Sequence, residues 1–152
     1  MALCSDLQDF MNVLNFAIDD TMARDMREAV IGELRETIQK KVYDAYPEPK
    51  QYERKMDNGG LTDPRNFEVD YDDRIKLLTA YSTRVDWEPT TPYHPKRFVF
   101  PVVEEEIQRY DWWKEAFPRP FHEPAEKELV ESGLADRVLE RGVNSIMGNL
   151  VL

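Results

Sequence analysis

The sequence has a single cysteine, Cys4, and therefore cannot form a disulfide bond within the chain. Disulfides belong to oxidising compartments, so the composition gives no sign of such a compartment. Residues 1–10 contain Asp6 and Asp9 but no basic residue, and they lack the charged start and apolar run of a signal peptide. No stretch approaches the roughly 20 apolar residues of a membrane-spanning helix. These absences predict a soluble protein that is made and kept in a cytoplasm.

The chain has fewer basic residues than acidic ones. The chain carries 20 Lys and Arg against 30 Asp and Glu, which gives a formal net charge of −10. A free-standing DNA-binding domain is ordinarily basic, because it must neutralise phosphates. Here the basic residues are interleaved with acidic ones, and no basic run is longer than Lys40-Lys41. We therefore expect no appreciable binding of duplex DNA. The acidic excess suits solubility, a basic protein partner, or a channel wall along which DNA slides without adhering.

Signatures of catalysis and of metal binding are missing as well. The sequence has no glycine-rich phosphate loop, no serine-centred elbow and no cysteine pair. The two histidines, His94 and His122, have no second ligand at the spacing of a zinc site. The cluster Asp70, Asp72 and Asp73 lacks the glycine and the glutamate that complete an EF-hand loop, so we interpret it as a solvated turn. We expect no enzymatic activity, no cofactor and no metal.

Apolar periodicity predicts a long helix in the first third of the chain. Apolar residues recur every four positions from Val30 to Val42, which predicts an amphipathic helix over 21–46 that Pro47 ends. An earlier apolar stripe within 1–20 either continues this helix or forms a separate short one. The apolar positions of that stripe are Leu7, Phe10, Met11, Leu14 and Ile18.

The periodicity changes near Lys50, where residues begin to alternate. We predict two or three antiparallel strands within 50–86, packed by one face on the long helix. The supporting signals are the turns at Asp57-Asn58-Gly59-Gly60 and Asp63-Pro64-Arg65-Asn66, and the alternating stretches Phe67 to Tyr71 and Ile75 to Tyr81; Gln51 to Met56 is a candidate further strand.

The last part of the chain returns to a helical pattern. Glu123-Pro124 opens a helical region over 122–147, with proline in the first turn, and Gly133 breaks or kinks it. We therefore predict one α+β domain over 1–152. In this domain a long N-terminal helix packs on a small antiparallel β-sheet, and one or more C-terminal helices close the structure.

Residues 87–121 combine prolines with many aromatic residues. Rigid aromatic side chains and Arg are enriched at protein interfaces, and a proline-fixed backbone lowers the entropic cost of binding. Adjacent Trp112 and Trp113 would point about 100° apart on a helix, so they cannot face the same core position. An equally good interpretation is that the aromatic residues fill the core. The candidate interaction residues are Trp87, Tyr93, Phe98, Phe100, Trp112, Trp113, Phe117, Arg119 and Phe121.

Three short motifs, in order, carry a resemblance to a known family. They are Val42-Tyr43-Asp44-Ala45-Tyr46 at the end of the long helix, Tyr52-Glu53-Arg54 leading through Asn58-Gly59-Gly60-Leu61 into a strand, and Pro118-Arg119-Pro120-Phe121 followed by Glu123-Pro124-Ala125. In this order they resemble the small head–tail joining and tail-completion proteins, which are minor tail components of long-tailed bacteriophages. The sequence departs from that family between Trp87 and Phe117, where it is longer and richer in proline.

The resemblance implies a structural virion protein, made in the host cytoplasm, that forms a ring at the neck or tail-completion position. Its partners would be copies of itself and the neighbouring head connector and tail proteins, with DNA only as passing cargo and no membrane contact. A closed ring requires two different patches on each subunit. Tail completion, tail termination and connector roles stay open. The alternatives are an acidic inhibitor that binds a basic, nucleic-acid-handling protein, and a small enzyme with a scattered site.

Overall fold

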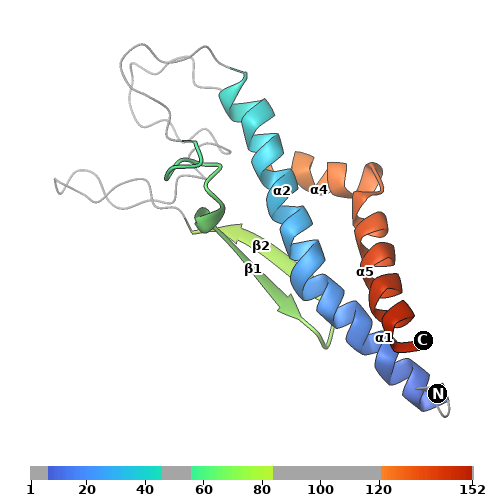
Figure 1. Cartoon of the computed structure of the whole chain (residues 1–152). Helices are drawn as coiled ribbons and strands as arrows, with labels where there is room; N and C mark the ends of the chain where they lie inside the picture. Colours follow the sequence, from blue (N-terminus) through green and yellow to red (C-terminus); the bar gives the residue numbers. More distant parts are fainter. Residues whose placement is uncertain (1–6, 46–55, 84–120, 152) are drawn as a thin grey trace, which may run out of the picture.

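The computed structural model describes residues 7–45, 56–83 and 121–151. In chain order these residues form one long helix, a β-hairpin and two C-terminal helices (Figure 1). The fold class is therefore α+β with a long N-terminal helix, as the change of periodicity near Lys50 predicts. Residues 51–55 of the candidate further strand lie outside the described residues, and Met56 belongs to a turn.

The first helix is continuous from Leu7 to Tyr43, so the stripe within 1–20 continues the long helix. The buried residues Thr21 and Met26 are five positions apart, which is the spacing of a π-helical turn. The extra residue in this turn rotates the side chains that follow it around the helix axis. The segments are α1 (Leu7–Thr21), the π-helical turn η1 (Met22–Met26), α2 (Arg27–Ile38) and the π-helical turn η2 (Gln39–Tyr43).

The hairpin lies beside the long helix. After a short 3-10 helix, η3 (Pro64–Asn66), β1 (Phe67–Asp72) pairs antiparallel with β2 (Leu77–Ser82). Because side chains alternate along a strand, Phe67 and Ala80 face the long helix and join the core, whereas Glu68 and Thr79 are exposed. One face of the hairpin therefore packs on the long helix, as predicted.

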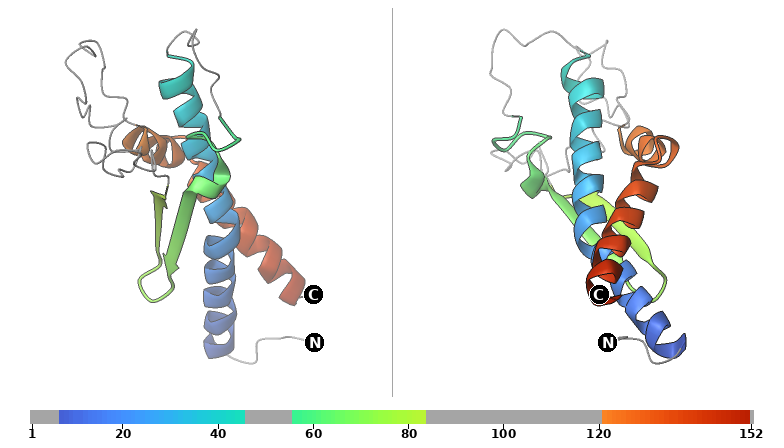
Figure 2. Two further views of the ribbon diagram at one scale, coloured as in Figure 1. Left: turned by 90° about the vertical axis from the view of Figure 1, so that its left-hand side faces the viewer. Right: turned by 45° about the vertical axis from the view of Figure 1, so that its right-hand side comes forward.

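Two helices complete the described structure, α4 (His122–Glu131) and α5 (Leu134–Val151). Gly133 separates them with a φ of +67°, a left-handed conformation that suits glycine and commonly ends a helix. Both the start near Glu123-Pro124 and the break at Gly133 agree with the sequence prediction. Helix α4 packs on α2, and α5 packs on α1, so that the start of α1 and the end of α5 lie at the same end of the molecule (Figures 1 and 2).

The core forms where α2, the hairpin and α4 meet. Its centre is fully buried, with Ile38 and Phe121 both 0% exposed. Val130 is 68% exposed, although its neighbour Leu129 is buried, because consecutive residues on a helix point about 100° apart. The buried cluster consists of Leu34, Ile38, Val42, Tyr43, Leu61, Phe67, Phe121 and Ala125.

Candidate interaction surface

The loop before the hairpin is fixed to the long helix by hydrogen bonds. Inside the core, the backbone N–H of Leu61 donates to the Tyr43 hydroxyl at 2.9 Å. On the surface, Arg35 Nε donates to the carbonyl oxygen of Thr62 at 2.7 Å, and the same guanidinium binds Asp57 Oδ2 at 2.9 Å. These contacts hold the predicted glycine-containing turn against α2 and η2.

Asp63 organises the same loop. Its side chain is 2% exposed. Its two oxygens accept hydrogen bonds from the backbone N–H groups of Gly59 at 2.7 Å and Arg65 at 3.0 Å, and from the Arg65 guanidinium. The Arg65 side chain, followed by the two backbone donors, holds the pKa of Asp63 well below its usual range. We therefore assign this carboxylate to loop structure and not to acid–base chemistry.

The far end of the hairpin is tied to α1. Asp19 Oδ1 accepts a hydrogen bond from the Tyr71 hydroxyl at 2.6 Å and forms an ion pair with Lys76 Nζ at 2.5 Å. The hydrogen bonds from Lys76 and Tyr71 lower the pKa of Asp19, whereas burial, followed by the bond to Asp19, raises the pKa of Tyr71. The hairpin is thus anchored to the long helix at both of its ends.

The aspartates of the hairpin have protein partners. Asp70 accepts a hydrogen bond from the Tyr81 hydroxyl at 3.1 Å, and Asp72 forms an ion pair with Arg74 at 3.1 Å. The bonds from the Tyr81 hydroxyl to Glu68 and then to Asp70 raise the pKa of Tyr81 to about 12. Within 7–45, 56–83 and 121–151, no three His, Cys, Asp or Glu side chains are arranged to hold a metal ion.

An open groove of about 320 Å³ lies between α2, β2 and α4. Its lining is largely apolar and includes the buried residues Leu34, Ala125 and Leu129. His122 and Glu126 also line it, and the His122 ring lies 4.6 Å from the ring of Phe121 between centroids. The groove is suited to an apolar side chain of a partner more than to a charged ligand.

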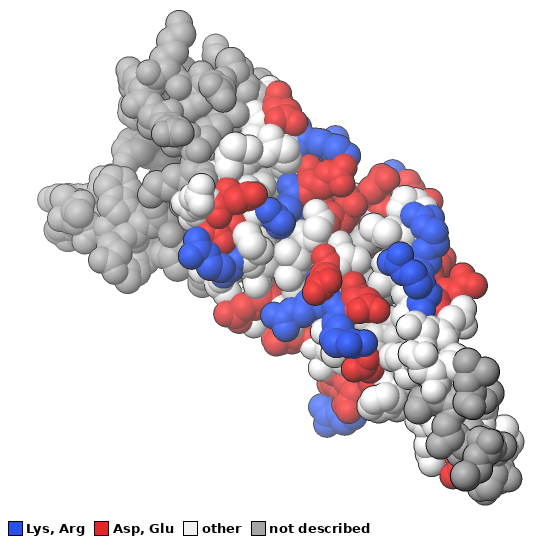
Figure 3. Space-filling model, viewed as in Figure 1, with Lys and Arg blue, Asp and Glu red and all other residues white. Residues whose placement is uncertain are grey.

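The end of the molecule where α1 begins and α5 ends is almost without charge. We call this region, residues 7–18 and 142–151, the helical pole. Asp9 is its only charged residue, in a chain of which one third is charged. Figure 3 shows the described surface at this end almost entirely white, whereas red and blue are mixed over the rest of the face. The helical pole is thus chemically distinct from the remaining described surface.

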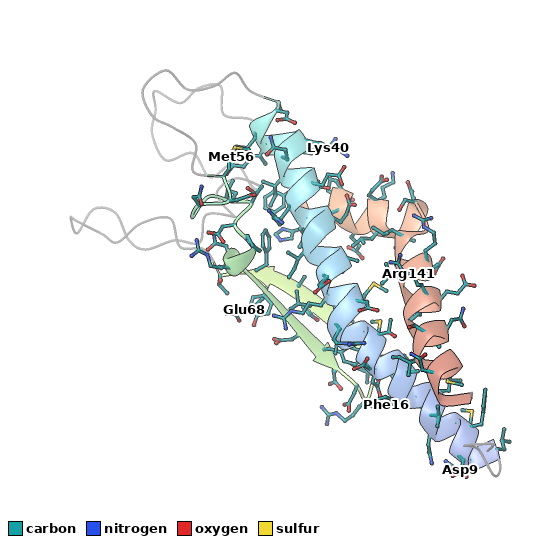
Figure 4. All side chains as sticks on the ribbon, viewed as in Figure 1. Asp9, Phe16, Lys40, Met56, Glu68 and Arg141 are labelled. Carbon is teal, nitrogen blue, oxygen red and sulfur yellow. The ribbon has the colours of Figure 1, made fainter. Side chains whose placement is uncertain are left out.

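The helical pole also exposes large apolar side chains. Leu7 is 76% exposed and Phe16 60% exposed, and Phe10 and Met11 are about two-fifths exposed. Figure 4 labels Asp9 and Phe16 on this part of α1. Ala17, by contrast, is fully buried where α1 packs on α5. An exposed apolar patch on an otherwise polar protein marks an interaction site. The helical pole is therefore our candidate interaction surface.

The sequence-predicted interaction residues are placed only in part. Phe121 is 0% exposed and belongs to the core cluster beside Ala125, so its side chain packs inside the chain and offers no surface to a partner. The other eight residues, from Trp87 to Arg119, lie outside the described residues and stay a prediction. The exposed side of the helical pole was missed, although one signal for it was visible in the sequence: the near absence of charge from 7–18 and 142–151.

Within the part that the structure describes, no helix is long and apolar enough to cross a membrane.

The chain was compared with known proteins and with protein families. Neither the curated proteins nor the solved structures contain a significant match to the chain. The model of the YomN family matches residues 6–145, which include nearly all of the long helix, the hairpin, α4 and most of α5. The chain therefore belongs to the YomN family, and it is a phage-associated protein.

Proposed function

We propose that this protein is a non-catalytic structural component of a phage particle, a ring-forming subunit at the neck or tail-completion position. The observation that carries the proposal is the helical pole, where Leu7 and Phe16 are largely exposed on a surface with one charge. Apolar surface of this kind is stabilised by burial against another protein, at roughly 25 cal/mol for each Å² removed from water. Membership of a phage-associated family is consistent with a role in the particle.

A ring needs two different patches on each subunit, because each copy binds its neighbours head to tail. Among the described residues, the apolar groove between α2, β2 and α4 is a candidate for one of these two patches. The net charge of −10 suits a ring through which DNA passes with little adhesion.

A second candidate function, an acidic inhibitor of a basic nucleic-acid-handling protein, finds less support. Such an inhibitor would present a dense carboxylate surface in place of phosphates. In Figure 3 the visible described surface mixes both signs. Several carboxylates are also engaged by cations of the same chain, as in the ion pairs of Asp63 with Arg65 and of Asp19 with Lys76. These pairs reduce the number of carboxylates available to a basic partner.

The role in the particle is tested by deleting the gene from the phage and examining the particles by electron microscopy and mass spectrometry. We expect the protein in purified wild-type particles, and we expect the deletion to give filled heads and tails that fail to join, or incomplete tails. Expression of the protein in trans should restore infectious particles. Complete, infectious particles that lack the protein would refute the structural role.

A further inference from the structure

We propose that the helical pole is a self-association surface, on which a second copy of this chain packs its own helical pole. This inference rests on the structural role proposed above and names the partner of the same surface. Three observations support it: the arrangement of apolar residues around α1, the distribution of charge, and the antiparallel packing of α1 with α5.

The first observation is that α1 is apolar on more sides than α5 covers. Ala17 is buried against α5 and marks the covered side. At 100° per residue, Phe16 lies about 100° from Ala17 in one direction around the helix, and Met11 lies about 120° away in the other. Phe16 is 60% exposed and Met11 43% exposed. The apolar residues of α1 therefore span more than half of its circumference, and the side opposite Ala17 carries the amides Gln8, Asn12 and Asn15. An apolar surface of this width extends beyond the contact with α5 and is available to a partner.

The second observation is electrostatic and favours a copy of this chain over a charged partner. Two chains of net charge −10 repel each other, and the repulsion is least where charge is absent. The helical pole has only Asp9, whereas a basic partner would be drawn to the acidic remainder of the surface. The other polar residues of the pole are uncharged amides and hydroxyls, which both donate and accept hydrogen bonds and can therefore pair with their own kind. They are Gln8, Asn12, Asn15, Asn144, Ser145 and Asn149.

The third observation is geometric. α1 and α5 run in opposite directions and cross obliquely, as the two views of Figure 2 show, so that the exposed sides of both helices near their free ends are open to a second copy. A second pole, related by a two-fold axis, would bring the same apolar patch from each copy together. Phe16 and Met11 lie on opposite sides of the α1–α5 contact, so one such contact covers the side that carries Phe16.

The test is the oligomeric state of the full chain, measured by sedimentation equilibrium and native mass spectrometry. We expect the wild-type chain to self-associate. Phe16→Glu, which places a charge in the apolar patch, should weaken association at least about tenfold, as loss of a central interface residue does. The matched control is Val130→Glu, because Val130 is 68% exposed on α4, away from the pole. This control should associate like the wild type.

A second variant guards against a folding defect in Phe16→Glu. Asn15 is exposed on the same helix, so Asn15→Glu adds a charge to the pole without removing an apolar side chain. The circular dichroism spectrum of Asn15→Glu should match that of the wild type, and its self-association should be weaker. A wild-type chain that stays monomeric up to about 100 µM would overturn the proposal, as would association unaffected by both charge substitutions.

The contact itself is mapped with a photo-crosslinking amino acid at position 16 of the full chain. We expect cross-links to residues 7–18 or 142–151 of another copy. Cross-links that map to the groove between α2, β2 and α4 would overturn pole-to-pole packing in favour of a head-to-tail contact. This outcome is separable from failure of the structural role, since the presence of the protein in particles and the deletion phenotype do not depend on which surface two copies share.

Discussion

Gly142 on α5 lies so close to Thr21 on α1 that a β-carbon at position 142 would stand 2.7 Å from Thr21 Oγ1 and still closer to Thr21 Cγ2. Asp25 Oδ2 would be 3.0 Å away. Both neighbours belong to the helix that α5 packs on, and Thr21 is fully buried. Glycine therefore permits this close approach of the two helices.

Gly142→Ala should destabilise the protein, because the added methyl group forces the helices apart. We expect a loss of about 1–3 kcal/mol in the free energy of unfolding, measured by urea denaturation. Gly32→Ala is the control, since nothing lies within 4 Å of a β-carbon at this exposed position of α2. It should stabilise by about 0.5–1 kcal/mol, as alanine does inside a helix. Equal effects of both substitutions would contradict the close packing of α5 on α1.

Tyr43→Phe should destabilise the loop before the hairpin. The substitution keeps the ring in the core but leaves the buried N–H of Leu61 without the hydroxyl that accepts its hydrogen bond. We expect a loss of about 1–3 kcal/mol, the usual cost of an unsatisfied buried polar group. Tyr81→Phe removes a hydroxyl that binds Glu68 and Asp70 on the exposed face, and it should cost clearly less. If Tyr81→Phe proves the more harmful change, the assignment of Tyr43 as a loop anchor is wrong.

Asp63→Asn should make the free energy of unfolding less dependent on pH in the acidic range. The pKa of Asp63 is depressed in the folded state by Arg65 and Gly59, so the unfolded chain takes up the proton first, near the ordinary value of 3.8. The stabilisation is therefore complete above that value and is lost as the pH falls toward the lower, folded pKa. Urea midpoints measured from about pH 7 to about pH 3 should fall more steeply for the wild type than for Asp63→Asn. Equal slopes for the two proteins would contradict this assignment of Asp63.

Free duplex DNA should not bind appreciably at physiological salt, even if the assembled protein surrounds a DNA channel. Useful affinity needs several basic contacts to phosphate, and the chain carries an acidic excess with both signs mixed over the visible face. Fluorescence anisotropy at about 150 mM salt is the measurement. Micromolar binding that weakens steeply with added salt would contradict both this prediction and the idea of an inert channel.

Local signals in the sequence predicted much of the fold. The alternation after Asn66 predicts both strands, because side chains on a strand point to opposite faces. Pro124 and Gly133 predict the start and end of α4, because proline fits the first helical turn and glycine accepts a positive φ. Each of these features depends on residues that are close together in the chain.

The candidate interaction surface was harder to predict from the sequence, because the exposure of an apolar side chain depends on which other segments of the chain pack against it. Periodicity marked the stripe that includes Phe10 and Met11, but it does not reveal whether α5 buries all of it. In the same way, the aromatic density around Phe121 suggested an interface as readily as a core, and only its packing beside Ala125 assigns it to the core. Burial by segments distant in the chain is a property of the tertiary structure.

The π-helical turn η1 has a mechanical consequence. A π-helical turn holds one more residue than an α-helical turn, so it rotates all following side chains by about 100° without interrupting the hydrogen-bonded rod. The rod from Leu7 to Tyr43 is therefore about 55 Å long and belongs to two packing units at once, the pair with α5 and the core with the hairpin and α4. A partner that binds the helical pole consequently binds one end of a helix whose other end lies in the hydrophobic core. The orientation of the helical pole in an assembly therefore also sets the orientation of the hairpin.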